Sequence, residues 1–220
     1  MPGYATRNLT VQVGGHDYRL RMLSDKQQYA DRDGLAHRAG ISSAQWCLFG
    51  QHWPAGQVLA QAMSEIELGG RRILELGCGL GLSSLVLKHR GADITASDHH
   101  PLANEFLQHN AILNGLSPIC YRDLPWTAPD ATLGRFDLII GSDILYERDH
   151  GVQLAAVMLR HAHPDALVMI ADPGRGQRGG FTRSMLEQGY LCCERSPDFG
   201  EHRGASRGRL LSYRRPSKLN

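Results

Sequence analysis

The residues best suited to chemistry form an acidic, glycine-rich turn. Glu75 precedes Gly77, Gly79 and Gly81, with Cys78 between the first two glycines. Glycine lets a backbone approach a ligand closely, and a carboxylate can hold a charged amino group directly or through water. A dinucleotide-binding turn requires G-x-G-x-x-G, and here leucine stands where its third glycine should be. The turn therefore favours a ligand other than NAD or FAD.

Further polar residues follow two later apolar segments. Asp98 comes directly after residues 93–97, where its two carboxylate oxygens can accept hydrogen bonds from ribose hydroxyls. An acid at this position also occurs in NAD-binding folds, so it indicates a ribose without distinguishing the cofactor. Asp123 and Trp126 are suited to the amino group and the face of an adenine, although a tryptophan here is also explained by packing in the core.

The elements that must position these residues alternate along the chain. We expect strands at 72–76, 93–97, 119–122, 136–142, 166–171, 190–195 and 209–214, and helices at about 81–90, 101–114, 149–161 and 179–188. This order predicts an α/β fold with a Rossmann-like, seven-stranded, mainly parallel sheet and helices on both faces. A loop instead of a helix joins the last two strands, which predicts an antiparallel last strand.

The first fifty residues follow a different pattern. Residues 8–22 alternate apolar and polar side chains around Gly14 and Gly15, which predicts a β-hairpin. Residues 26–52 give no clear secondary structure, and a helix is expected from Pro54 until shortly before Gly69. We therefore expect an N-terminal extension with a β-hairpin at 1–53, followed by one α/β domain at 54–220.

Several segments carry a family resemblance over roughly residues 46–195. The acid-x-G-x-G-x-G turn resembles motif I of class I S-adenosylmethionine-dependent methyltransferases. Residues 136–147, with Asp143 and Tyr146, resemble the segment after strand four of the seven-β-strand protein lysine methyltransferases. The segments 53–56 (Trp-Pro-Ala-Gly) and 109–115 resemble that family too, which includes the methyltransferase-like 21 and electron-transfer flavoprotein β-subunit lysine methyltransferase types.

One short segment resembles a single branch of the family. Asp172-Pro173-Gly174-Arg175, followed by Gln177 and Phe181, is similar to the branch that methylates lysines of the electron-transfer flavoprotein β subunit. The Asp-x-x-Tyr element at Asp143 does not discriminate between protein substrates, so the target stays open at this point.

The resemblance implies S-adenosyl-L-methionine as cofactor, S-adenosyl-L-homocysteine as product and a protein lysine as substrate. The implied cofactor-binding residues are Trp53, Glu75, Gly77, Cys78, Gly79, Gly81, Asp98, Asp123, Trp126 and Ser142. The implied catalytic residues are Asp143 and Tyr146.

The reaction gives these two residues their roles. A lysine amine has an ordinary pKa of about 10.4 and must lose its proton before it attacks a methyl group. Asp143 would orient the amine, and Tyr146 would form a wall of the transfer pocket. Both have plainer explanations, Asp143 as the N-cap of the next helix and Tyr146 as a packing residue.

Composition limits the remaining possibilities. The chain has 220 residues and a net charge of only +2, which does not by itself indicate a polyanionic partner. Five cysteines without C-x-x-C spacing argue against disulfides or zinc, and the histidine pairs lack a complete set of metal ligands, so no metal is expected. No leader or apolar membrane-spanning run is recognisable, which favours a cytoplasmic location.

Three rival functions remain. A small-molecule amine N-methyltransferase is the strongest, because the same fold and similar segments serve small amines. A nucleic-acid methyltransferase is disfavoured because the proline-containing element expected after strand four is absent, although basic residues gather between Arg203 and Lys218. A cofactor-binding protein without catalysis is disfavoured because both Asp143 and Tyr146 are present.

Overall fold

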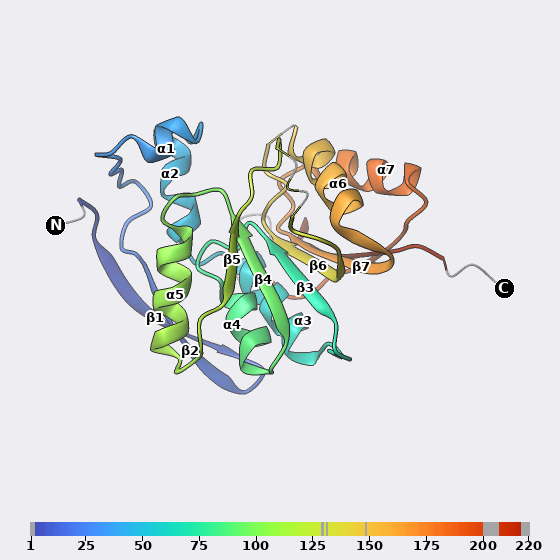
Figure 1. Cartoon of the computed structure of the whole chain (residues 1–220), viewed down its shortest axis with the longest axis horizontal. Helices are drawn as coiled ribbons and strands as arrows, with labels where there is room; N and C mark the ends of the chain where they lie inside the picture. The colour runs from blue at the N-terminus through green and yellow to red at the C-terminus, as the bar shows by residue number, and fades with distance from the viewer. Residues whose placement is uncertain (1–2, 129, 131, 148, 200–206, 217–220) are drawn as a thin grey trace.

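The computed structural model describes residues 3–128, 130, 132–147, 149–199 and 207–216. Its centre is a seven-stranded sheet with the order β5-β4-β3-β6-β7-β9-β8 (Figure 1). The strands are β3 (Arg72–Leu76), β4 (Asp93–Asp98), β5 (Cys120–Asp123), β6 (Phe136–Ser142), β7 (Ala162–Asp172), β8 (Leu191–Arg195) and β9 (Arg209–Arg214). Neighbouring strands from β5 to β7 pair in parallel, and β9 pairs antiparallel with both β7 and β8. The predicted fold class, including its antiparallel last strand, is confirmed.

Helices cover both faces of the sheet, as expected. The helices α3 (Pro54–Glu65), α4 (Leu82–His89) and α5 (Ala103–Leu113) contribute to one apolar core, which includes Leu59, Leu85 and Phe106. The helices α6 (His150–His161) and α7 (Arg178–Glu187) contribute to a second core, which includes Met158 and Phe181. Burial on both faces explains the continuous apolar character of β6 and β7.

The N-terminal residues form the predicted hairpin, β1 (Thr6–Val13) and β2 (His16–Leu23), which lies beside α5 (Figure 1). Gly14 and Gly15 form its two-residue turn with φ of 58° and 81°, a conformation that favours glycine. Short helices follow in the region without a sequence prediction: α1 (Leu35–Arg38), α2 (Ser43–Trp46) and the 3₁₀ helix η1 (Leu48–Gly50).

Two asparagines hold the hairpin in place, one within α5 and one at its C-terminal cap. Asn114 accepts a hydrogen bond from Arg19 N at 2.9 Å and donates to Arg19 O at 2.7 Å. Asn110 makes the same pair of contacts with the backbone of Arg21, and its side-chain amide also donates to Leu80 O at 3.0 Å. Asn110 therefore connects the hairpin to the glycine-rich turn after β3.

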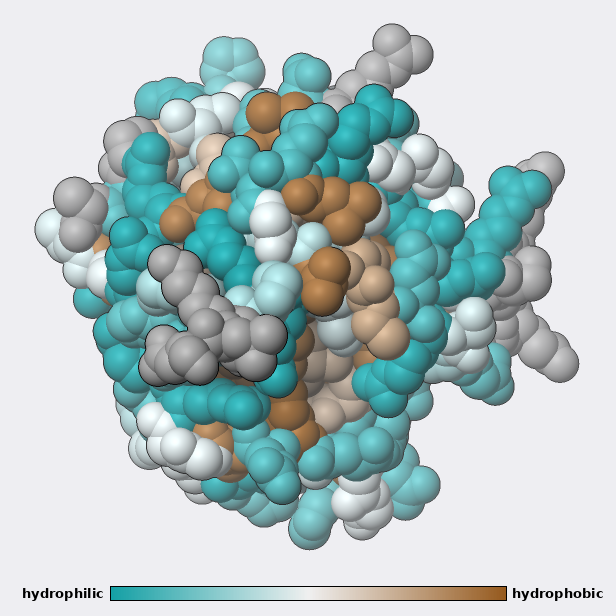
Figure 2. Space-filling view, turned by 90° about the vertical axis from the view of Figure 1, so that its right-hand side faces the viewer, coloured by the Kyte–Doolittle hydropathy of each residue, from teal (hydrophilic) through white to brown (hydrophobic). Residues whose placement is uncertain are grey.

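β8 forms the edge of the sheet opposite β5. Figure 2 shows the side of the molecule that carries α6 and α7, with apolar residues grouped near the centre of a largely hydrophilic face. Leu191 of β8 is 63% exposed, but the neighbouring Glu194 and Arg195 are exposed as well. Charged side chains on an edge strand oppose pairing with a second sheet.

The basic segment noted in the sequence begins at Arg203 and ends at Lys218. Both of these residues lie outside the described residues.

Candidate active site

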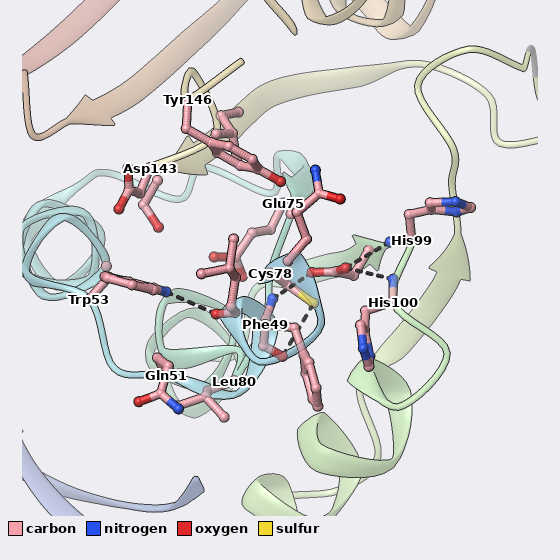
Figure 3. A pocket seen from close by; sticks show the side chains of 18 of the residues that line it. Phe49, Gln51, Trp53, Glu75, Cys78, Leu80, His99, His100, Asp143 and Tyr146 are labelled. Carbon is pink, nitrogen blue, oxygen red and sulfur yellow. Dashed lines mark hydrogen bonds between the residues drawn. The ribbon is translucent and has the colours of Figure 1, made fainter. Parts of the chain in front are cut away.

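A cavity of about 460 Å³ opens where β3, β4 and β6 end and is closed on one side by the N-terminal segment. All predicted site residues except Asp123 line it: Trp53, Glu75, Gly77, Cys78, Gly79, Gly81, Asp98, Trp126, Ser142, Asp143 and Tyr146. Trp53 and Asp143 lie at one end, His99 and His100 at the other, with Glu75 and Cys78 between them (Figure 3). The volume falls within the range that encloses a ligand of drug or nucleoside size.

The glycine-rich turn is shaped first by the protein's own packing. Gly77, Gly79 and Gly81 have φ of 63°, 52° and 79°, which side-chain-bearing residues rarely adopt. A Cβ at Gly79 would lie 2.7 Å from Phe49 O, and a Cβ at Gly77 would lie 2.7 Å from Cγ2 of Ile144. We expected these glycines to make room for a ligand, and the structure shows that neighbouring segments already require them.

Asp98 organises the backbone around it. Its Oδ2 accepts a hydrogen bond from Gly79 N at 2.8 Å, and its Oδ1 accepts from His99 N at 2.7 Å and His100 N at 2.9 Å. Burial raises the pKa of this carboxyl above its usual range, and the three backbone donors act in the opposite direction. A carboxylate offers about four acceptor positions, so Asp98 retains capacity for a ligand hydroxyl.

Glu75 is the most deeply buried acid of the site. Its Oε2 accepts hydrogen bonds from Ser84 N at 3.0 Å and from the Ser84 hydroxyl. Burial raises the pKa of this carboxyl to about 7, against the opposing effect of the Ser84 bonds. Ser84 therefore fixes the carboxyl against α4, at the floor of the cavity.

The two residues predicted to recognise adenine lie in different surroundings. Trp126 lines the cavity and meets the edge of the His150 ring, with centroids 4.9 Å apart. Asp123 ends the edge strand β5, and its side chain is 75% exposed, 3.5 Å from Nδ1 of His99. The structure does not bring Asp123 to the cavity, because the edge position of β5 leaves its last residue facing solvent.

Asp143 faces Arg175 across the mouth of the cavity. Arg175 Nε donates to Asp143 Oδ1, and Arg175 Nη2 donates to Oδ2, both at 2.6 Å. The helix α6 begins at His150 and has Asp149 at its N-cap position, so the alternative explanation of Asp143 as this helix's cap is wrong. Sequence reasoning noted Arg175 only within a branch-specific motif and did not assign it to the site.

Tyr146 lines the cavity beside His150. Its ring meets the His150 ring edge-on, with centroids 4.6 Å apart, and its hydroxyl points into the cavity (Figure 3). Burial raises the pKa of this phenol to about 12. Tyr146 is therefore protonated at neutral pH and can both donate and accept a hydrogen bond.

Sequence reasoning missed a pair of stacked rings. Phe49 and His100 lie with centroids 3.8 Å apart and planes 14° apart, and both line the cavity. Burial lowers the pKa of His100 to about 3, so its ring is neutral. Within the described part of the chain, His100 Nε2 is buried and has no hydrogen-bond partner.

Comparisons with known proteins identify the family. The family model described as lysine methyltransferase matches residues 43–183. The chain belongs to the lysine methyltransferase family. The mouse electron transfer flavoprotein beta subunit lysine methyltransferase is 32% identical over 192 residues, which cover 83% of this chain and 71% of that protein. The mouse protein N-lysine methyltransferase METTL21A is 31% identical over 147 residues, covering 63% and 66%.

Solved structures agree on the fold of the methyltransferase. The T. thermophilus 16S rRNA N2 G1207 methyltransferase, in complex with AdoMet and guanosine, superposes with a TM-score of 0.62 at 18% identity, covering 96% of this chain and 51% of that one. Magnesium protoporphyrin IX methyltransferase from Synechocystis, with bound SAM, gives a TM-score of 0.56 at 18% identity, covering 74% and 78%. At this identity the likeness shows the fold alone.

This protein is therefore an S-adenosyl-L-methionine-dependent lysine methyltransferase. Its cavity fits such a cofactor, because a nucleoside and an amino acid find different partners there. The stacked rings of Phe49 and His100 lie near the Asp98 carboxylate, which accepts hydrogen bonds. Glu75 and the glycine-rich turn lie at the centre of the cavity. In the part of the chain that the structure describes, no helix has the length and apolar character needed to cross a membrane.

Proposed function

We propose that this methyltransferase modifies a lysine side chain of a protein and that Asp143 and Tyr146 form the site of transfer. The observation that carries the proposal is their position on the same cavity as Asp98 and Glu75, at the end marked by Trp53 (Figure 3). One cavity thus offers partners for a nucleoside at one end and for a cation at the other.

The cofactor-binding roles follow from the donors and acceptors present. Asp98 would hold a ribose hydroxyl with its remaining acceptor position, and His100 Nε2 would serve as a further polar contact. Glu75 lies beside the glycine-rich turn and would attract the amino group of the methionine portion of S-adenosyl-L-methionine. Trp126 offers an aromatic face, whereas Asp123 is not included because it lies outside the cavity.

Transfer requires a positioned, neutral amine. When bound, S-adenosyl-L-methionine supplies an electrophilic sulfonium methyl group. Asp143 would orient the amine by accepting a hydrogen bond from it and would accept a proton released in the reaction. The hydroxyl oxygen of the protonated Tyr146 would accept a hydrogen bond from the same nitrogen, which leaves the lone pair free to attack. Trp53 would exclude water from this end of the cavity. Positioning of this kind can lower a barrier by several kcal/mol.

The electron transfer flavoprotein β subunit is the substrate that we propose to test first. Two relatives of about 32% identity, from mouse and rat, carry that substrate in their names and span 83% and 88% of this chain. The Asp172-Pro173-Gly174-Arg175 segment supports the same branch, and it delivers Arg175 to the mouth of the cavity.

The test uses purified enzyme, methyl-labelled S-adenosyl-L-methionine and recombinant flavoprotein β subunit. We expect label on lysine, located by mass spectrometry of the digested protein. Labelling should fall at least 100-fold with Asp143→Asn. A parallel reaction replaces the subunit with cell lysate. No label on the subunit, together with lysine labelling of another protein in the lysate, would reject the substrate while leaving the lysine chemistry in place.

We also propose that the enzyme acts in a reducing compartment, with the cytoplasm as the first candidate. Its five cysteines are all free thiols, among them the buried Cys47 and Cys78. Imaging of a fluorescently tagged protein in its source cells tests the location, and a signal confined to another compartment would contradict it.

A further inference from the structure

The ion pair with Arg175 occupies both carboxylate oxygens of Asp143, the residue predicted to be catalytic. Both carboxylate oxygens accept from the guanidinium at 2.6 Å, in the fork geometry that arginine and carboxylates favour. The Asp143 side chain is only 8% exposed, whereas that of Arg175 is 43% exposed. The group proposed to bind the substrate amine therefore already binds a cation that belongs to the protein.

The same guanidinium lies over an aromatic ring. Arg175 Cζ is 5.4 Å from the centroid of Trp53, a distance at which a cation is attracted to the ring face. Trp53 is fixed by a hydrogen bond from its Nε1 to Leu48 O at 2.9 Å. An anchored indole and a nearly buried carboxylate thus both lie against the Arg175 guanidinium, at one end of the cavity (Figure 3).

We propose that Trp53 and Asp143 form the subsite for the substrate ammonium group and that Arg175 occupies this subsite until a substrate lysine displaces it. This inference rests on the proposed site of transfer. It adds a specificity-determining residue that competes with the substrate for the same two partners.

The surroundings of Arg175 allow it to leave. Arg175 lies between Gly174 and Gly176, whose φ values are 93° and 96°, and a Cβ at Gly176 would have no neighbour within 4 Å. The backbone beside Arg175 is therefore uncrowded on that side. Movement of this partly exposed side chain would uncover Asp143 without opening either apolar core.

Displacement also has a consequence for specificity. A lysine ammonium is a point charge and cannot reproduce the two parallel hydrogen bonds of the guanidinium fork. A free amine would therefore compete poorly with Arg175. A lysine on a protein surface brings additional contacts that can offset the lost ion pair. Arg175 would thus select docked protein lysines over small amines.

The experiment measures binding of a lysine side-chain analogue, n-butylammonium chloride, by calorimetry in the presence of saturating S-adenosyl-L-homocysteine. We expect Arg175→Ala to bind it at least about tenfold more tightly than the parent, because the competing occupant is gone. Arg175→Lys should show a smaller gain. Arg183→Gln removes one positive charge from an exposed position of α7 outside the cavity lining and should match the parent.

A double variant locates the gain. Adding Asp143→Asn to Arg175→Ala should remove the improved binding, because the subsite then lacks its carboxylate. Equal affinities of the parent and Arg175→Ala, or no binding to either, would overturn the proposal. Unchanged affinity for S-adenosyl-L-homocysteine shows that each variant is folded. Because no turnover is needed, a wrong choice of protein substrate would leave this result unaffected.

Guanidinium chloride separates displacement from a merely positioning role of Arg175. If Arg175 only positioned Asp143, added guanidinium would restore methyl transfer by Arg175→Ala. The proposal expects inhibition of that variant instead, competitive with the lysine substrate, and rescue of its activity would overturn it.

Discussion

A Cβ at Gly79 would lie 2.7 Å from Phe49 O, so the glycine-rich turn and the N-terminal segment are in direct backbone contact. Gly79 N also donates to Asp98 Oδ2 at 2.8 Å. Any side chain at this position therefore disturbs both the wall of the cavity and the acid proposed to hold the ribose.

We predict that Gly79→Ala lowers the free energy of unfolding by about 2–4 kcal/mol, from the positive φ together with the steric overlap. Gly91→Ala is the matched control. Gly91 has φ of 78° but no neighbour within 4 Å of its Cβ position, so its loss should be about 1 kcal/mol. Denaturant unfolding compares the two variants, and equal losses would show that the contact with Phe49 is unimportant.

Asp98→Ala should weaken S-adenosyl-L-methionine binding by roughly 10- to 100-fold, since a hydrogen bond to a charged group contributes about 1.5–3 kcal/mol. Calorimetry measures the dissociation constant. Asp93→Ala, at the exposed start of the same strand, should retain the parent's affinity. An unchanged constant for Asp98→Ala would mean that other groups hold the ribose.

Glu75 should make stability depend on pH. Its folded pKa of about 7 lies above the usual glutamate value of 4.5, so the folded state binds this proton more tightly than the unfolded chain does. The resulting stabilisation is present below about pH 4.5 and is lost as the pH rises through 7.

The variant Glu75→Gln removes this titration. Between pH 5 and 8 the ligand-free parent should lose up to about 3 kcal/mol relative to Glu75→Gln, from one pKa unit being about 1.4 kcal/mol. Unfolding curves at several pH values test this. Parallel pH profiles for the two proteins would mean that Glu75 does not titrate in this range.

Several features of the fold could be predicted from local sequence patterns. Apolar runs ending in Leu76 and Ser97 defined buried strands, and the acids and glycines after them marked the cavity, because parallel strands end at one edge of a sheet. The loop before Arg209 correctly predicted an antiparallel last strand.

Contacts between distant segments could not be predicted in this way. Phe49 lies in a region without periodicity and meets His100 only after folding. Asp143 and Arg175 are likewise joined by tertiary structure, and their ion pair leaves no local signal. Asp123 had a suitable residue type and spacing, but the edge position of its strand leaves it outside the cavity.

Asp143→Asn should lower turnover by roughly 100-fold or more while cofactor affinity stays within a few-fold, as expected for a positioned acid–base group. The amide keeps the shape but cannot accept a proton. Asp149→Asn, at the exposed start of α6, is the control and should leave turnover unchanged. Near-parental turnover of Asp143→Asn would remove Asp143 from the catalytic site.

The most direct measurement of the central claim identifies the chemical group that receives the methyl. Lysate from the source cells is incubated with the purified enzyme and methyl-labelled S-adenosyl-L-methionine, and the protein fraction is hydrolysed to amino acids. Lysine methylation at this cavity predicts that the label appears in methyllysine and that Asp143→Asn abolishes most of it. Label confined to nucleic acid or to small amines, with none in methyllysine, would contradict it.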